Sequence, residues 1–450
     1  MINPNSKLQI PKPEVRSLKS ATNPQQIEET TTSNPQRTTD KIKIIRIIAR
    51  LNVGGPARHV VWLTKELQDN EFQSTLLAGT VPEGEEDMSY FAAENAVEPI
   101  FIEEMSRELS PKDVVSLWKV YLQIKREKPD IIHTHTAKAG TIGRVAGFFY
   151  RWLTFGTLIG KPRRVKLVHT YHGHVFHSYY GNLKTRIFLF IEKTLARLAT
   201  DKIVVISRQQ FEEIHKKFGV GRAKQFETIP LGIDLEPFKD WKLRQNILRG
   251  EIAAGTDEIL VGLVGRLTEI KNISLLLQVA QIYRKTKNAD FPKLKFIVVG
   301  DGNMRQELER EAETRRVKDV VTFLGNRNDT DVFYAGLDII ALTSLNEGTP
   351  LSLIEAMANE KAVISTAVGG TIDLLGTVER EFDGFQICER GLLGASNDAE
   401  GFFNGLIYLA KDEKLRKKLG ANGQNFVELQ YGKARLVNDI KNLYRKLIES

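Results

Sequence analysis

The feature that most constrains this chain is an alternation of short apolar runs with helical patterns, which occurs in two series. The first series opens at Lys43–Ala49, and the second opens at Ile259–Val264, after a proline-containing stretch near Leu231–Asp240. Such alternation favours right-handed βαβ units and parallel sheets. We therefore predict an α/β protein with two doubly wound, Rossmann-like domains facing a cleft. The other strand candidates are Ser74–Gly79, Asp130–His133, Val165–Thr170, Lys202–Ile206, Phe226–Ile229, Leu294–Val299, Val320–Leu324, Asp338–Thr343 and Ala362–Thr366.

Composition sets the expected domain boundaries. Residues 1–40 are rich in Pro, Ser, Thr, Asn and Gln and can bury little apolar surface, so we predict a disordered tail. The first domain is expected at 41–238 and the second at 239–432. The last segment, 433–450, has one apolar stripe at helical spacing, which predicts a helix that docks on another part of the molecule.

Cysteine usage and hydropathy suggest a location. A single cysteine, Cys388, excludes an intramolecular disulfide and fits a reducing compartment. There is no uncharged apolar run of about 18 residues, the length that a membrane-spanning helix needs. The N-terminus lacks the apolar core of a secretory signal. We therefore expect a cytoplasmic protein.

Positive charge is concentrated in one segment. The formal net charge is +8, yet residues 138–208 hold 13 Lys and Arg against Glu192 and Asp201. Aromatic residues such as Phe148, Phe149 and Trp152 lie in the same segment. Such a segment can attract phosphates, nucleic acid or anionic lipid headgroups, and its aromatic residues suit a membrane interface. A core helix with a solvated basic end is the alternative.

A glycine pair follows the first predicted strand. Gly54 and Gly55 precede Pro56 and a helical pattern, so the backbone amides at the helix start could hold an anion. A purely structural tight turn explains the pair equally well. The pair is not the G-x-G-x-x-G pattern of nicotinamide-binding proteins.

Two basic residues follow the first strand of the second series. Arg266 offers a planar fork and Lys271 a point charge, and both suit a diphosphate. Solvated surface charges are the alternative interpretation, and it is the usual fate of such residues. Ligands of open α/β sheets bind at the carboxyl ends of the strands, where both residues fall.

The most informative segment runs from Ser344 to Gly370. Glu347 lies in a loop after a predicted strand, and Thr349 and Pro350 have the types of an N-cap and a first helical residue. Glu355 follows about one and a half turns into the predicted helix. Two carboxylates flanking free amides can grip hydroxyl groups at two points of one ligand. A capped helix with two surface carboxylates is the alternative.

Together these motifs resemble those of the retaining glycosyltransferases of family 4, which have the GT-B fold, and the resemblance covers about residues 42–450. The motifs are Glu347 with Glu355, Gly265-Arg266-Leu267 with Lys271-Asn272, Gly300-Asp301-Gly302 with Arg305, and Ile229–Asp234. Two further segments, His133–Gly140 and His169–His174, look like members that build bacterial surface polysaccharides.

The resemblance implies a role for each motif in binding a nucleotide-sugar donor. Arg266 and Lys271 should contact the diphosphate, and Glu355 should accept hydrogen bonds from the ribose. The loop of Gly54 and Gly55 should close over the phosphates. The donor sugar should be held by Glu347 and by the backbone of Gly348, Thr349, Pro350 and Leu351.

The resemblance also implies that the first domain faces the acceptor and that the final helix packs back on it. Among the histidines, His172 should lie nearest the reacting sugar, so the expected catalytic residues are His172, Glu347, Arg266 and Lys271. We expect His133 and His169 to be hydrogen-bonded structural residues. A zinc site is conceivable, but these segments add no neighbouring carboxylate, and we predict no metal site.

This sequence departs from the family pattern in places. Glu360 stands where the family usually has glycine, and Leu231 replaces a usual asparagine. The segment 370–395 carries unusual charge. No departure removes an expected donor contact.

The resemblance implies retaining transfer of a sugar from a nucleotide-sugar, with UDP the expected nucleotide, to a lipid-linked or polysaccharide acceptor in cell-surface glycan synthesis. No cofactor or metal is expected. Residues 138–208 could bind the inner face of an anionic membrane. A sugar-nucleotide epimerase or phosphorylase on the same fold stays open, because fold alone does not set the reaction.

Two other classes are less well supported by the motifs. A nicotinamide-dependent oxidoreductase would need a glycine fingerprint after a strand, and none stands in the right place. A protein that binds nucleic acid or another anionic surface would explain the basic segment, but no recognisable nucleic-acid-binding module is present.

Overall fold

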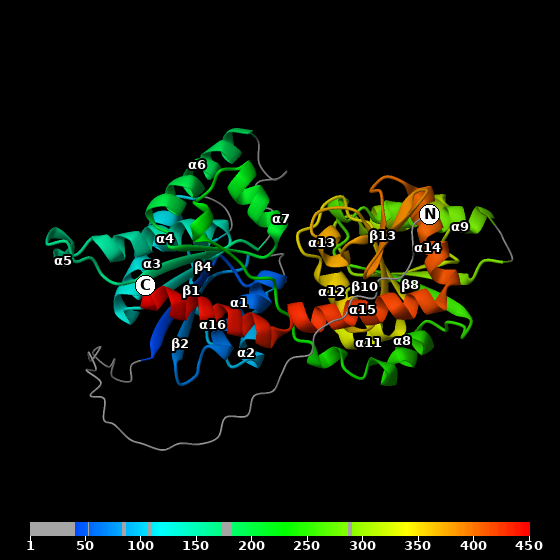
Figure 1. Cartoon of the computed structure of the whole chain (residues 1–450), viewed down its shortest axis with the longest axis horizontal. Helices are drawn as coiled ribbons and strands as arrows, with labels where there is room; N and C mark the ends of the chain where they lie inside the picture. Colours follow the sequence, from blue (N-terminus) through cyan, green and yellow to red (C-terminus); the bar gives the residue numbers. More distant parts are fainter. Residues whose placement is uncertain (1–40, 53, 83–86, 107–109, 173–181, 287–289) are drawn as a thin grey trace, which may run out of the picture. The chain divides into compact units, whose positions relative to one another are not determined.

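The computed structural model describes residues 41–450 except 53, 83–86, 107–109, 173–181 and 287–289. The predicted disordered tail, residues 1–40, and His174 lie outside the described residues. The described chain builds two sheets, each covered by helices (Figure 1). The predicted α/β class with two Rossmann-like sheets is confirmed.

The first sheet has seven parallel strands in the order β3-β2-β1-β4-β5-β6-β7. Their bounds are β1 Ile42–Ile48, β2 Phe72–Gly79, β3 Ile100–Ile102, β4 Ile131–His135, β5 Lys166–Thr170, β6 Lys202–Val205 and β7 Phe226–Thr228. The helices are α1 Gly55–Glu66, α2 Ser89–Glu94, α3 Lys112–Glu127, α4 Ala137–Trp152, α5 Phe155–Leu158, α6 Asn182–Leu198 and α7 Arg208–Phe211. The six strand candidates of the first series all fall on strands, and only the short β3 was not predicted.

The second sheet has eight strands in the order β10-β9-β8-β11-β12-β15-β14-β13. Their bounds are β8 Glu258–Val264, β9 Lys293–Val299, β10 Val321–Gly325, β11 Ile339–Leu342, β12 Ala362–Thr366, β13 Val378–Phe382, β14 Phe385–Cys388 and β15 Gly391–Gly394. The helices are α8 Gln245–Glu251, α9 Ile273–Thr286, α10 Arg305–Thr314, α11 Thr330–Gly336, α12 Leu351–Ala358, α13 Thr371–Leu375, α14 Ala399–Lys411 and α15 Glu413–Tyr431.

One edge of the second sheet differs from the prediction of parallel strands. β13 pairs antiparallel with β14, and β14 pairs antiparallel with β15, whereas β15 is parallel to β12. These three strands lie in the segment 370–395 that the sequence marked as unusual. The sequence did not predict β13 because every one of its residues is exposed, and β14 and β15, although mostly buried, have only four residues each.

Helix α16, Lys433–Glu449, lies on the first sheet (Figure 1). Its buried stripe of Leu436, Ile440, Leu443, Tyr444 and Leu447 joins one core cluster with residues of β1, α1 and β4. Two ion pairs, from Lys441 to Asp69 and from Arg445 to Glu71, also link the helix to the residues just before β2. The predicted apolar stripe therefore docks on the first sheet.

Small residues bring α4 close to the strands that carry the first half of the candidate site. A Cβ atom at Gly140 would lie 2.5 Å from the ring of His169, and one at Gly143 would lie 2.5 Å from Thr134. Real Cβ atoms do not approach other atoms so closely, so glycine is required at both positions. Helix α4 therefore packs closely on β4 and β5, whose backbone pairing places His135 opposite Thr170.

Candidate functional site

The loop after β1 reaches a residue of the second half of the chain. Gly54 has φ +155°, and a Cβ atom at Gly55 would lie 2.9 Å from the Leu351 side chain at the start of α12. Two of the residues predicted to bind the donor, Gly55 and Leu351, are therefore in contact. The absence of side chains at the glycine pair permits this close approach.

A lysine and a carboxylate meet after β8 and β11. Lys271 Nζ lies 2.6 Å from Glu347 Oε1, and the Ser344 hydroxyl donates a 2.5 Å hydrogen bond to the same oxygen. Glu347 is buried, and Lys271 is partly exposed. The structure thus brings together two residues, 76 positions apart, that the sequence analysis placed in one ligand site.

Gly369 and Gly370 pack against the backbone of the Glu347 loop. A Cβ atom at Gly369 would lie 1.8 Å from the Glu347 carbonyl oxygen, and one at Gly370 would lie 1.9 Å from that of Gly348. The Gly370 amide also donates to the Glu347 carbonyl at 3.2 Å. The chain around 369–370 therefore holds the backbone of Glu347 and Gly348 in place before any ligand arrives.

Arg266 occupies the loop after β8. Its side chain is exposed and makes no ion pair with another residue in the described part of the chain. The loop after β8 packs against the loop after β9. A Cβ atom at Gly300 would lie only 2.1 Å from the Gly265 carbonyl oxygen. The backbone around Arg266 is thus fixed while its guanidinium is available to an anionic ligand.

The start of α12 differs in detail from the prediction. The helix begins at Leu351, the N-cap is Pro350, and no side chain of the described residues caps the first turn. The prediction of Thr349 as N-cap and Pro350 as first helical residue was wrong by one position. Because no side chain caps α12, its first backbone amides are left for a ligand.

Glu355 lies on α12 in the wall of a cavity of about 510 Å³. The cavity is lined from both halves of the chain, with Gly55, Arg58 and His59 on α1 and with Leu351 and Glu355 on α12. Burial raises the pKa of Glu355, while the positive charge of Arg58 opposes this shift. A carboxylate in a cavity wall is suited to accept hydrogen bonds from ligand hydroxyl groups.

His133 and His169 are structural, as predicted. Both are fully buried. His133 forms hydrogen bonds with Tyr444 at 2.6 Å and with Thr170 at 2.7 Å, and His169 forms one with Thr134 at 2.8 Å. Burial holds the pKa of each imidazole well below its usual range.

His172 follows β5 and faces a second histidine. Its Nε2 lies 2.9 Å from His135 Nδ1 at the end of β4. Burial lowers the pKa of His172 to about 4. The ring of His59 lies beside both rings, with centroids 4.8 Å from His172 and 5.7 Å from His135.

Sequence reasoning did not find His59, Arg58 or Arg46. His59 and Arg58 lie inside α1, whose apolar pattern suggests a core helix, and Arg46 lies inside β1. Arg46 is fully buried, and its Nη1 lies 3.3 Å from His133 Nδ1. Only the position of His59 one turn after the glycine pair could have signalled a place in the site.

The basic segment 138–208 is not one continuous surface. Lys138 is buried and paired with Asp113, Arg144 is buried and paired with Glu192, and Arg151 is paired with Asp201. Other basic residues of the segment, Lys161 and Arg164 among them, are exposed. Counting charges along the sequence therefore overstated the free positive charge.

Two Rossmann-like sheets covered by helices define the GT-B class of glycosyltransferase fold. Solved structures agree. Anabaena HepE in complex with UDP matches with a TM-score of 0.69 at 19% identity, covering 90% of this chain and all of that one. A glycosyltransferase from Rickettsia africae matches with a TM-score of 0.71 at 15% identity, covering 91% of this chain and all of that one.

Family models match both halves. The model "Glycosyltransferase Family 4" matches residues 53–237, and the model "Glycosyl transferases group 1" matches residues 245–426. Together the two models cover most of the chain. The chain belongs to glycosyltransferase family 4, and it is a glycosyltransferase enzyme.

Curated relatives include two bacterial glycosyltransferases. An Escherichia coli UDP-Gal:alpha-D-GlcNAc-diphosphoundecaprenol alpha-1,3-galactosyltransferase is 29% identical over 79% of this chain and 85% of its own length. The capsular polysaccharide biosynthesis glycosyltransferase CapM of Staphylococcus aureus is 26% identical over 75% of this chain and 82% of its own length.

Proposed function

We propose that this enzyme transfers a sugar from a UDP-sugar, with retention of anomeric configuration, to a lipid-linked acceptor in the synthesis of a bacterial cell-surface glycan. The observation that carries the proposal is the Lys271–Glu347 pair, which stands beside the exposed Arg266 and the uncapped start of α12. Positive groups and free amides suit a diphosphate, and a fixed carboxylate suits sugar hydroxyl groups.

The relatives support the finer parts of this proposal. The Escherichia coli relative is named for UDP-Gal as donor and for an acceptor on diphosphoundecaprenol, and the HepE structure contains UDP. A uridine diphosphate and a polyprenol-linked acceptor are therefore the first ligands to test with this chain.

The proposed chemistry breaks the bond between the sugar C1 and the diphosphate oxygen and forms a bond from C1 to the acceptor oxygen. The acceptor hydroxyl loses its proton to the departing diphosphate on the same face. Arg266 and Lys271 stabilise the negative charge that develops on the diphosphate, and His172 lies near the reacting sugar. Proton NMR of the product reports the anomeric configuration, and inversion would contradict the retaining assignment.

Transfer is proposed to need no metal on the diphosphate. Arg266, Lys271 and the amides of α12 supply positive charge where other enzymes use Mg²⁺. Turnover should therefore be the same with and without added Mg²⁺. A rate that rises more than tenfold with Mg²⁺ or Mn²⁺ would contradict this part of the proposal.

The donor site is tested first by thermal shift with UDP, GDP, ADP and their common sugar conjugates. A ligand that binds only the folded chain raises the melting temperature, and we expect UDP compounds to do so. The shift should vanish in Arg266→Ala and in Glu355→Gln. Arg310→Ala, which removes an exposed arginine on α10, is the matched control and should retain it.

The role of Lys271 is tested by turnover. Lys271→Ala should slow sugar transfer by about 10²–10³-fold, since one preorganised group that stabilises transition-state charge contributes about this much. Lys293→Ala removes an exposed lysine of the same half and should leave the rate unchanged. An unaltered rate in Lys271→Ala would remove Lys271 from the mechanism.

The acceptor side is proposed to meet an anionic membrane through α5 and the turns that flank it. This tip extends away from the first sheet (Figure 1). Phe155 is 89% exposed and Leu158 is 80% exposed, and the exposed basic residues Lys161 and Arg164 follow. The exposed apolar residues of the tip are Trp152, Leu153, Phe155, Leu158 and Ile159. Apolar side chains beside cations suit an interface with anionic lipid.

Among the described residues, no helix is long and apolar enough to cross a bilayer. Attachment through the α5 tip would therefore be peripheral, and we propose the inner membrane face. Sedimentation with anionic liposomes should be lost in the Phe155→Ser, Leu158→Ser double variant. Leu243→Ser, at a residue of the second half that is 83% exposed, is the control. Sedimentation of the double variant like the wild type would exclude this surface.

A further inference from the structure

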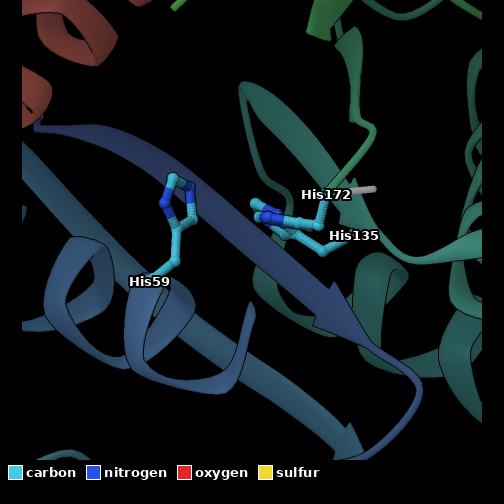
Figure 2. Close-up of side chains that lie close together, drawn as sticks. All are labelled: His59, His135 and His172. Atoms are coloured by element: carbon cyan, nitrogen blue, oxygen red, sulfur yellow. The ribbon is translucent and has the colours of Figure 1, made fainter. Parts of the chain in front are cut away.

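Three histidines from three elements meet in the first half of the chain. His59 lies on α1, His135 ends β4, and His172 follows β5. Each offers one ring nitrogen, and these nitrogens all lie within 4.8 Å of one another. Figure 2 shows the rings of His135 and His172 directed toward His59.

Four of the six ring nitrogens of this cluster lack hydrogen-bond partners among the described residues. Both ring nitrogens of His59 are buried without a partner among the described residues, and so are His135 Nε2 and His172 Nδ1. The only hydrogen bond within the cluster joins His135 to His172. An unpartnered buried polar group costs about 1–3 kcal/mol, so four of them in one place indicate that the site receives a ligand.

The chemistry of the cluster points to a transition-metal ion. The donor atoms are imidazole nitrogens, which suit Zn²⁺, Co²⁺, Ni²⁺ or Cu²⁺, whereas Mg²⁺ and Ca²⁺ require oxygen ligands. We propose that His59, His135 and His172 bind one ion of the Zn²⁺ class, with a fourth position open. The proposed ion does not bind the diphosphate, where no metal is proposed, but the cluster includes His172, which the proposed transfer places near the reacting sugar.

The geometry requires only a small adjustment. Zinc–nitrogen bonds of about 2.0–2.1 Å in a tetrahedral site place the nitrogens roughly 3.3 Å apart. His135 and His172 are already at 2.9 Å, so both rings would separate slightly. His59 would rotate toward them about its side-chain bonds.

Nearby charge sets the expected affinity. The buried Arg46 lies beside His133. After burial itself, the positive charges of Arg46 and Arg435 are among the causes that lower the pKa of His59. Positive neighbours repel a divalent ion, so we expect micromolar binding, far weaker than in a dedicated structural zinc site. The same neighbours would attract an anion, so the effect of Arg46 distinguishes the two kinds of occupant.

A bound ion would join the first turns of α1 to the ends of β4 and β5. His59 lies five residues after Gly54 and lines the same cavity as Gly55 and Glu355. The ion would therefore hold the glycine loop beside the cleft, and it should raise the melting temperature in proportion to its concentration above Kd.

The test uses the full chain without an affinity tag, stripped with EDTA and desalted. Equilibrium dialysis against Zn²⁺ should find one ion per chain, and Co²⁺ should give the absorption bands of a tetrahedral complex. His59→Gln should weaken binding at least tenfold. His215→Gln, at a partly buried histidine outside the cluster, is the control and should bind normally.

Three further measurements make the result decisive. His59→Cys should restore binding and add the charge-transfer absorption of a cobalt thiolate, which shows that the side chain at 59 is a ligand. Arg46→Met should tighten Zn²⁺ binding if the site holds a cation. Circular dichroism of each variant shows whether it is folded. If His59→Gln does not fold, His59→Cys still tests whether the side chain at position 59 is a ligand.

No binding of Zn²⁺ or Co²⁺ by the wild-type chain would overturn the proposal, as would equal binding by His59→Gln. Binding of inorganic phosphate that competes with Zn²⁺ and weakens in Arg46→Met would also overturn it, since it would identify an anion site. None of these outcomes involves a nucleotide-sugar, so failure of the metal site is distinguishable from failure of the proposed transfer.

Discussion

Two arginines in the first half of the chain are completely buried, yet their surroundings are opposite. Arg144, on α4, pairs with Glu192 at 2.6 Å, and Tyr171 donates a 2.5 Å hydrogen bond to the same carboxylate. Arg46, on β1, has His133 and Tyr444 beside it, and its Nε and Nη2 atoms have no partner among the described residues. One arginine belongs to a neutralised structural pair, and the other carries uncompensated charge near the candidate site.

The difference between Arg144 and Arg46 distinguishes a buried charge that the fold neutralises from one that a ligand could neutralise. A buried pair is worth little against apolar residues of similar volume, but removing one partner is costly because the other charge remains buried. A buried cation with no carboxylate already carries that cost in the folded chain. Uncompensated charge therefore marks a functional region more reliably than a buried ion pair does.

The largest effect should come from exchanging the two arginines for methionine. Arg144→Met leaves Glu192 buried without its cation and should lower the free energy of unfolding by about 3–5 kcal/mol. Arg46→Met strands no carboxylate, and His133 keeps its hydrogen bond to Tyr444, so the change should stay within about 1 kcal/mol. Urea unfolding followed by circular dichroism measures both. Equal losses in the two variants would mean that Arg46 has an anionic partner in solution.

A buried lysine of the second half extends the comparison to pH. Lys361 Nζ donates to the Ala335 carbonyl at 2.7 Å and lies 3.5 Å from the Trp241 ring centroid. Burial lowers the pKa of Lys361 to about 7, against about 10.5 in an unfolded chain. Between these pH values the unfolded chain holds more protons, so this residue makes the protein more stable as pH rises from 7 to 10.5.

The measurable consequence is a difference between variants. We compare the free energy of unfolding of Lys361→Met with that of wild type at each pH. This difference should favour the variant by roughly 2–3 kcal/mol more at pH 7 than at pH 9.5. The value is smaller than the full pKa shift would give because the Trp241 ring favours the charged lysine. Lys242→Met removes an exposed lysine beside the same ring and should show no such dependence. A pH-independent difference for Lys361→Met would mean that the lysine stays charged when folded.

The sequence predicts the sheets better than the site. The longer core strands carry apolar runs that are visible without knowing their partners, whereas the exposed β13 and the short strands β3, β14 and β15 do not. Lys271 and Glu347 could be assigned to one site because both follow strands, whose carboxyl ends share an edge. His59 could not, because its direction depends on how α1 docks. The charge of Arg144 could not be discounted either, because Glu192 stands 48 residues away and reaches it only through tertiary packing.

The smallest expected effect concerns Glu360, where the family usually has glycine. Glu360 has φ +57°, a left-handed conformation that costs an ordinary residue about 1 kcal/mol. Its ion pair with Lys242, at 3.6 Å, is exposed on the lysine side and contributes little. Glu360→Gly should therefore raise the free energy of unfolding by about 0.5 kcal/mol, since the greater freedom of glycine in the unfolded chain offsets part of the gain. Glu360→Ala removes the same carboxylate but keeps the Cβ atom, so it should give no gain. If urea unfolding gives the same free energy of unfolding for Glu360→Gly and Glu360→Ala, the left-handed backbone at residue 360 does not destabilise this chain.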